Sequence, residues 1–214
     1  MTPPDISKWL KTLPITLGIF FTFSLYLFLR RGYYNLYIIN KAFGSTAVVL
    51  AGITLLLGPL AQKYPSLNNL NLLKRQLGLS ALASALLHLI ATYLQSSRFT
   101  PSWYKDQWLS VNFGIIAVTI WFFLAYLSSN KKVEDLGFAS WKRLQSIGGR
   151  VAFLAIFLHL VLMKYPGWIK WLNGEVKKSP ELANPSYPPA SIFVFLFMVG
   201  VILFRLKNYV AVKK

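Results

Sequence analysis

The stretch RQLGLSALASALLHLIATYLQS at residues 75–96 decides the fold. It stays apolar for about the 20 residues that a helix needs to cross ~30 Å of hydrocarbon. Its length and uniformity do not fit the alternating strands of a barrel, and an open sheet is not viable in lipid. The sequence therefore predicts an all-α polytopic membrane protein, a six-transmembrane-helix bundle formed by one domain, 1–214. The other five expected spans are about 14–30, 43–62, 108–128, 146–164 and 189–206.

Composition supports the membrane class. The chain is 55% hydrophobic with a mean hydropathy of +0.49, whereas soluble domains are roughly 45–50% apolar. The net charge of +17 is spread over all the loops, so membrane topology and contact with anionic lipid headgroups explain it better than nucleic acid does. The absence of cysteine excludes disulfides, thiolate-ligated or covalently attached c-type haem, and cysteine-bound iron–sulfur clusters.

The distribution of basic residues gives an expected topology. Six alternating helices place the N-terminus, the 63–74 and 129–145 loops and the C-terminus on one side, and this side carries more Lys and Arg than the other. Positive charge thus favours cytoplasmic termini. The basic start followed by an apolar run resembles a signal peptide, but Arg30 and Arg31 follow it in place of small residues, so we expect a retained first helix. No internal repeat is evident.

The 165–188 segment is the longest expected connection on the outer side. Its Trp168 and Trp171 suit the headgroup interface. The segment is either an interfacial anchor or a docking surface for a partner.

The chain has two histidines, and both lie inside expected spans. His88 follows Arg75 by 13 residues, which corresponds to ~20 Å of helix, and His159 precedes Lys164 by five residues, or ~8 Å. Helices 3 and 5 run in the same direction, so the two imidazoles are expected at similar depth in the outer half of the membrane. An ionisable side chain in the bilayer core marks a functional site by default.

Two histidines at matched depth favour a shared ligand over separate hydrogen-bonded packing roles. Neutral imidazoles are axial ligands of haem iron, and two facing ones give a six-coordinate centre suited to electron transfer. Zinc is a weaker candidate because a structural zinc site takes four ligands. Small residues near both histidines suit either a flat macrocycle or close helix packing. We therefore predict His88 and His159 as cofactor-binding residues and axial ligands of a haem iron.

Four stretches resemble the MsrQ/YedZ family, the haem-binding membrane subunit of a periplasmic protein-methionine-sulfoxide reductase system within the ferric-reductase-like transmembrane superfamily. They are FGSTAVVLAGITLLLGPLA at 43–61, KRQLGLSALASALLHLIATY at 74–93, FGIIAVTIWFFLAYLSS at 113–129, and LGFASWKRLQ at 136–145 leading to LHL at 158–160.

The resemblance implies a ferric-reductase-like helix bundle that binds haem b, with His88 and His159 at the family's helix 3 and late helix 5 positions. It also implies an electron-transfer subunit of an oxidoreductase without its own substrate site. Such a subunit would lie in a bacterial inner membrane or a thylakoid membrane and would pass electrons to an outer-side catalytic partner.

The sequence departs from the family at other motif positions. Gln145 stands in the place of the histidine of the W-x-x-L-H motif, and Lys41 and Ser45 replace a histidine and an arginine near the start of helix 2. Double-haem relatives carry a second histidine 13 or 14 residues along the same helix, where this chain has Lys74 or Arg75 and Gln145. We therefore expect one haem per chain.

The electron donor is expected to be a separate molecule. The chain has no Gly-rich dinucleotide fingerprint, so nothing in the sequence supports a flavin or nicotinamide site of its own. A cytoplasmic flavoprotein and a quinol are the two candidate donors. Arg150, about 180° around the helix from His159, is expected to snorkel to the inner headgroups or to pair with a neighbour. Lys164 and Arg98 are candidates to meet haem propionates.

Two other functions stay open at this point. One is a non-redox accessory or assembly subunit that keeps the fold, suggested by Gln145, Lys41 and Ser45. The other is a metal-ion reductase that works with an external flavoprotein. Transport is disfavoured because the spans have few acidic residues and no paired broken helices.

Overall fold

The computed structural model describes residues 3–95 and 100–212, and it confirms an all-α bundle. Six helices are long and apolar enough to cross a membrane. They are α1 (Pro3–Arg31), α2 (Leu36–Lys63), α4 (Lys74–Leu94), α5 (Pro101–Tyr126), α7 (Phe138–Leu172) and α8 (Ala190–Val212). Short helices η1 (Pro65–Leu67), α3 (Asn68–Asn71) and α6 (Asn130–Leu136) lie in the connections.

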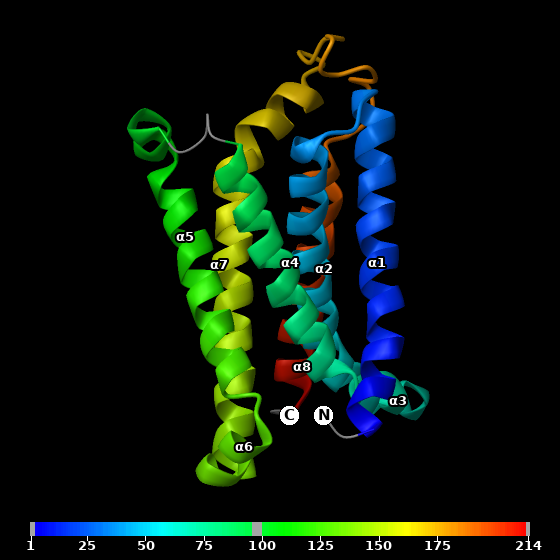
Figure 1. Ribbon diagram of the computed structural model, residues 1–214, viewed down its shortest axis with the longest axis vertical. Coiled ribbons are helices and arrows are strands. Elements are labelled where there is room, and N and C mark those ends of the chain that lie inside the picture. Colours follow the sequence, from blue (N-terminus) through cyan, green and yellow to red (C-terminus); the bar gives the residue numbers. More distant parts are fainter. Residues whose placement is uncertain (1–2, 96–99, 213–214) are drawn as a thin grey trace.

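The helices alternate in direction, as the sequence predicts. Figure 1 shows α1 starting and α8 ending at the same end of the bundle, together with α3 and α6. We call this the inner end, because it is the side where the sequence predicts more Lys and Arg, and we call the end with the 173–189 connection the outer end.

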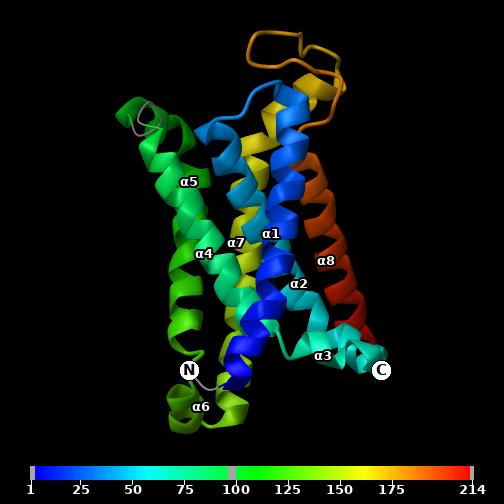
Figure 2. The same cartoon turned by 45° about the vertical axis from the view of Figure 1, so that its right-hand side comes forward.

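The bundle is built from two helix pairs with two additional helices. α2 packs most extensively on α4, and α5 on α7, whereas α4 and α5 touch only sparsely. α1 and α8 both pack on α2. Figures 1 and 2 show the α5–α7 pair standing beside the group formed by α1, α2, α4 and α8.

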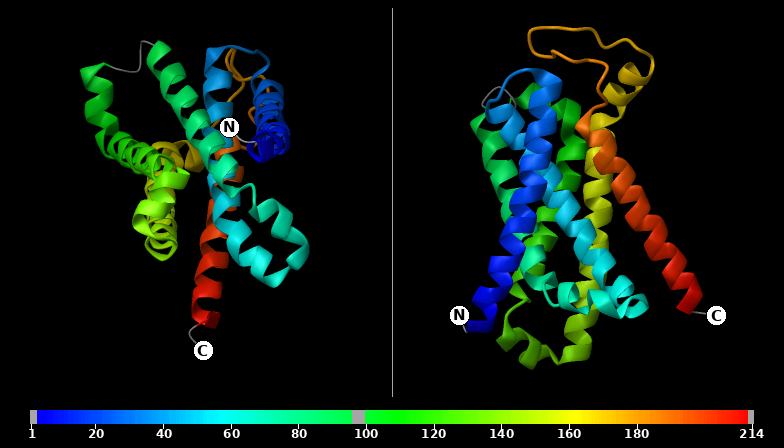
Figure 3. Two further views of the ribbon diagram at one scale, coloured as in Figure 1. Left: turned by 60° about the horizontal axis from the view of Figure 1, so that its bottom comes forward. Right: turned by 90° about the vertical axis from the view of Figure 1, so that its right-hand side faces the viewer.

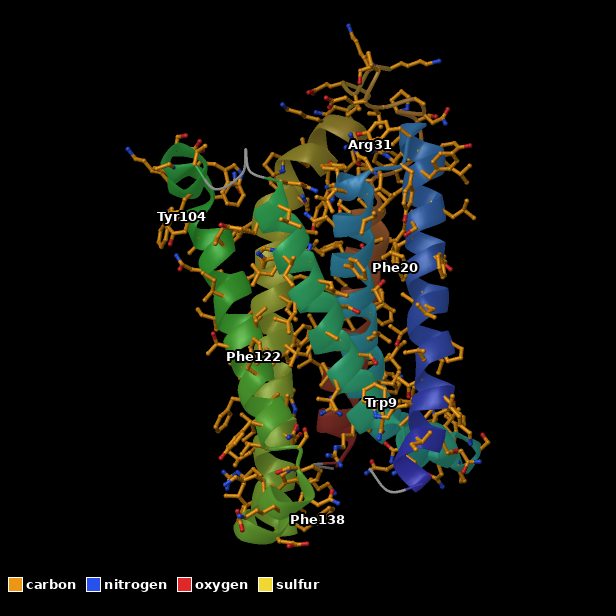
Figure 4. The ribbon with its side chains drawn as sticks, in the orientation of Figure 1. Trp9, Phe20, Arg31, Tyr104, Phe122 and Phe138 are labelled. Atoms are coloured by element: carbon orange, nitrogen blue, oxygen red, sulfur yellow. The ribbon has the colours of Figure 1, made fainter. Side chains whose placement is uncertain are left out.

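Large apolar side chains cover the outside of the bundle, as a lipid environment requires. Phe122 of α5, labelled in Figure 4, is one of these exposed side chains. The buried core is formed mainly by small or branched residues of α2, α4, α7 and α8. Examples of the exposed apolar residues are Leu10, Leu17, Phe21, Ile115, Phe122, Phe123, Leu196 and Leu203.

Helix 5 of the sequence prediction is longer than expected. The expected 146–164 span is the middle of α7, whose 35 residues run from Phe138 to Leu172. Its early start follows Gly137, where a φ of 72° ends α6, and Trp141 then donates its indole N–H to the Leu127 carbonyl at 2.8 Å. Pro166 lies in the outer part of α7, where Figure 1 shows the helix bending over the bundle. A proline removes one backbone hydrogen bond and bends a helix without ending it.

The outer connection is therefore 173–189, and Trp168 belongs to α7. Trp168 is buried and donates its indole N–H to the Ser191 hydroxyl at 2.8 Å, so it joins α7 to α8 and is not a headgroup anchor. The prediction placed this tryptophan in a loop because it ended the helix at residue 164.

The 173–189 connection is fixed to the outer end of α1. Arg30 donates from Nε to the Tyr187 carbonyl at 2.9 Å, and Asn184 donates from Nδ2 to the Leu29 carbonyl at 2.6 Å. Figure 4 shows Arg31 directly beneath this segment, and its Nη1 donates to the Glu181 carbonyl at 3.0 Å. These bonds make the connection an ordered cap on α1.

Candidate functional site

The two histidines lie on the two helix pairs in matching positions. His88 is on α4 and packs against α2, and His159 is on α7 and packs against α5. Both residues are half-buried, and His159 is among the electrostatic neighbours of His88. Each histidine thus contacts the neighbouring helix of its own pair in the same way.

One nitrogen of each ring is held by a backbone carbonyl of the neighbouring helix. His88 Nδ1 lies 3.0 Å from the Asn40 carbonyl oxygen, and His159 Nδ1 lies 2.8 Å from the Ser110 carbonyl oxygen. A carbonyl oxygen can only accept, so each neutral imidazole carries its proton on Nδ1. This bond fixes the tautomer and the ring orientation.

The other nitrogen of each ring, Nε2, makes no hydrogen bond within the described residues. Neither Nε2 is among the enclosed side-chain atoms that lack a partner there, which are Arg31 Nε, Asn71 Oδ1, Gln76 Oε1 and Gln95 Nε2. Each Nε2 lone pair is thus without a hydrogen-bond partner among the residues that the structure describes. An imidazole with Nδ1–H bonded to a carbonyl and Nε2 free is the form that ligates a metal.

A glycine lies against each ring, one helical turn after the residue whose carbonyl accepts its proton. A Cβ placed on Gly44 would come within 3.1 Å of His88 Nδ1, and one placed on Gly114 within 3.0 Å of His159 Nδ1. Both distances are shorter than an ordinary van der Waals contact. Neither helix could approach its histidine this closely with a side chain at these positions.

Hydroxyl groups complete the matching. The Thr92 hydroxyl donates to the His88 carbonyl at 2.7 Å and accepts from Asn40 Nδ2 at 3.1 Å. In the second pair, the Ser110 hydroxyl donates to the His159 carbonyl at 3.0 Å. Each histidine is thus fixed through its ring and through its own backbone.

The two helix pairs therefore share one local arrangement, although no internal repeat is evident in the sequence. Gly44 precedes His88 by 44 residues, and Gly114 precedes His159 by 45. Phe-Gly stands at 43–44 and 113–114, and Leu-His-Leu at 87–89 and 158–160. These matches indicate the shared arrangement, but two or three residues are too few to recognise it before the contacts between them are known.

The same relation continues 14 residues toward the inner end, where the histidines are absent. Gln145, 14 residues before His159, donates from Nε2 to the Leu124 carbonyl at 2.8 Å, much as His159 does to Ser110. At the corresponding place in the first pair, Lys74 Nζ would lie 3.3 Å from a Cβ placed on Gly58. This second position therefore presents an amide and an amine, neither of which is an imidazole ligand.

The donor set at the outer position suits a metal that brings most of its own ligands. The described residues contain no group of three or more His, Cys, Asp and Glu side chains that could hold a bare ion. A structural zinc site takes four protein ligands, whereas an iron already bound by a macrocycle takes two axial ones. Two imidazoles, each backed by a glycine, fit the second case.

Two lysines lie near the histidines, whereas Arg150 lies elsewhere on α7. Lys164 is an electrostatic neighbour of both histidines, and Lys41 of His88. Lys41 Nζ also lies 4.4 Å from the centre of the Tyr37 ring. Arg150 is exposed and donates to the Ser146 hydroxyl at 2.7 Å, one turn closer to the inner end, which agrees with the predicted pairing. Arg98 lies outside the described residues.

Comparison with known proteins adds no relative. Neither a family model nor a curated protein matches the sequence, so the resemblance to the MsrQ/YedZ family rests on the quoted motifs.

Proposed function

We propose that this protein is a membrane electron-transfer subunit that holds one haem b between His88 and His159. The observation that carries the proposal is the repeated arrangement of the two histidines. In both helix pairs a carbonyl holds Nδ1, a glycine backs the ring and Nε2 is free. When bound, haem would supply reversible one-electron chemistry at its iron.

The role of the protein residues follows from their contacts. The Asn40 and Ser110 carbonyls set the tautomer that presents Nε2, and the bonds restrict ring rotation. Gly44 and Gly114 let α2 and α5 lie against the rings. If both imidazoles held the iron, no open coordination position would remain, which would favour electron transfer over oxygen chemistry. Lys164, near both rings, is the candidate partner of a haem propionate.

The proposed path runs from a separate donor to an outer-side acceptor. With cytoplasmic termini, the histidines lie nearer the opposite face, which suits delivery to a partner such as a protein-methionine-sulfoxide reductase. Gln145 and Lys74 stand where an inner pair of ligands would be needed, so the proposal includes one haem only. A quinol in the bilayer or a cytoplasmic flavoprotein is the proposed donor.

The test is haem content with matched variants. The purified protein should show a b-type α-band in its reduced-minus-oxidised spectrum, and a pyridine haemochrome titration should give one haem per chain. His88→Ala and His159→Ala should each lose the bound haem, whereas Gln145→Ala should keep it. Full haem retention in either histidine variant would refute the proposal.

The accessory-subunit and metal-ion-reductase alternatives predict different results when the protein is purified and assayed. A colourless protein, produced with ample haem and purified within a larger complex, would indicate a non-redox accessory subunit. A haem protein that reduces ferric chelates when supplied with a flavoprotein donor, and that does not support sulfoxide reduction, would indicate a metal-ion reductase.

A further inference from the structure

Four basic side chains from three helices gather near the inner end of the bundle. They are Lys74 of α4, Lys142 and Arg150 of α7, and Arg205 of α8, and electrostatic interactions link Lys74 to Arg205 and Lys142, and Arg205 to Arg150. We call them the inner cationic cluster.

Two of these cations lie on the same turn of α2. Lys74 Nζ would be 3.3 Å from a Cβ on Gly58, and Arg205 Nη1 donates to the Leu55 carbonyl at 3.5 Å. Leu55 also meets α7, because a Cβ on Gly149 would lie 3.6 Å from Leu55 Cδ2. Three helices therefore converge on this turn, and both cations are half-buried there.

The electrostatic neighbours within the cluster are all positive. Lys74 has Arg205 and Lys142 as neighbours, and Arg205 has Arg150. The ion pair found among the described residues joins Lys132 to Asp135 elsewhere, so no described carboxylate pairs with the cluster. Gathered cations at a bundle end repel one another unless an anion lies between them.

Most of the donor capacity in the cluster is unused by the protein. Lys74 Nζ makes no hydrogen bond to the described residues, and Arg205 has one long bond from five N–H groups. Arg150 donates to Ser146, and Lys142 lies over the Phe138 ring. Guanidinium and ammonium groups are the usual protein partners of phosphate oxygens.

The position of the cluster fits a ligand that arrives from the bilayer. Lys74 is the first residue of α4, and Arg205 is near the end of α8. Figure 3 shows α8 leaning away from the other helices toward its C-terminal end, and Lys74 and Arg205 are both partly exposed. Basic pockets between helices at this depth are a known mode of anionic headgroup recognition.

We propose that the inner cationic cluster binds the phosphate headgroup of an anionic phospholipid. This function goes beyond electron transfer, and it holds whether or not haem is bound. It also gives Lys74 a role at the position where a second haem ligand is missing: the amine would hold the lipid between α4 and α8.

The test measures lipid binding to the full chain in detergent. Native mass spectrometry and thermal unfolding are followed while phosphatidylglycerol, phosphatidylcholine or inorganic phosphate is added. The wild type should bind phosphatidylglycerol most tightly. Lys74→Gln and Arg205→Gln should each weaken that binding about fivefold, and the double variant about 25-fold, from the contribution of one cation to anionic lipid binding.

Lys131→Gln is the matched control, because Lys131 is an exposed lysine of α6 at the same end of the bundle. It should leave the affinity unchanged. Lys74→Arg, which keeps the charge, should bind within about twofold of wild type and separates a lost charge from a folding defect. Equal binding of phosphatidylcholine, an unchanged double variant or an equal loss in Lys131→Gln would overturn the proposal. Inorganic phosphate binding as tightly as the lipid would overturn the lipid source.

Discussion

Gly114→Ala tests the geometry of the histidine site most directly. The new methyl carbon would lie 3.0 Å from Nδ1 and 3.3 Å from Cε1 of His159, where ordinary contacts are ~3.5–4.0 Å. The ring must therefore retreat from α5 by about 0.5 Å. The 2.8 Å bond from Nδ1 to the Ser110 carbonyl would then stretch past the usual limit of about 3.2 Å.

The expected cost separates cofactor binding from folding. Losing the Nδ1 bond removes about 1 kcal/mol, and the same movement displaces Nε2, so haem affinity should fall about fivefold to tenfold. Alanine also favours a helix over glycine by roughly 1 kcal/mol, which offsets the loss in the haem-free protein. Gly114→Ala should thus keep its thermal stability without haem while it binds haem more weakly. Gly44→Ala should behave alike, because its Cβ would lie 3.1 Å from His88 Nδ1.

The assay is a titration of haem-free protein with haem, followed by the Soret band and by thermal unfolding of the same samples. Gly78→Ala is the matched control, since Gly78 lies on α4 and a Cβ there would meet nothing within 4 Å. The reasoning fails if Gly114→Ala and Gly78→Ala bind haem with equal affinity.

Three smaller changes test other contacts. Ser110→Ala removes the hydroxyl bond to the His159 carbonyl and keeps the Ser110 carbonyl. Thermal unfolding should therefore show a stability loss of about 1 kcal/mol, and haem should still bind. Loss of haem would contradict the assigned roles. Gln145→Ala should cost about 1 kcal/mol by removing the bond to Leu124, and its haem stoichiometry, measured by pyridine haemochrome, should not change. Gly32→Ala places a Cβ 2.8 Å from the Ala183 Cβ at a φ of +82°, and it should lower stability by about 1–2 kcal/mol and speed protease cleavage of the 173–189 connection. Gly174→Ala, with a φ of +72° and no atom within 4 Å of the Cβ, carries only the backbone strain and should have a smaller effect on cleavage.

The helices were predictable because a membrane-spanning helix needs a long apolar stretch, and such a stretch is visible in the sequence. Length and apolarity located all six spans, and only their ends moved, most of all at α7. There the turns before Ser146 and after Lys164 contain Trp141, Arg143 and Pro166, which resemble a loop. The indole of Trp141 bonds to Leu127, just after α5, and that of Trp168 bonds to Ser191 of α8. These long-range bonds hold the two turns, and no local sequence pattern predicts them.

The two histidines could be singled out from the sequence, but their surroundings could not. Depth along a helix follows from counting residues, which brought His88 and His159 to similar levels. The acceptors of their Nδ1 protons are backbone carbonyls of Asn40 and Ser110. Every residue type has such a carbonyl, so the sequence cannot identify these acceptors. Gly44 and Gly114 are visible in the sequence, but a glycine in a membrane helix can have several roles.

The similarity of the two histidine sites, despite little sequence similarity, has a physical explanation. In each helix pair a few atoms must be fixed: one carbonyl, one glycine and one imidazole. Positions that face lipid need only to be apolar, so they can differ freely between the two pairs. Two copies of one arrangement can therefore share little more than Phe-Gly and Leu-His-Leu. The inner positions then differ further, with Lys74 in one pair and Gln145 in the other, because a carbonyl partner also suits an amide, and an amine suits an anion.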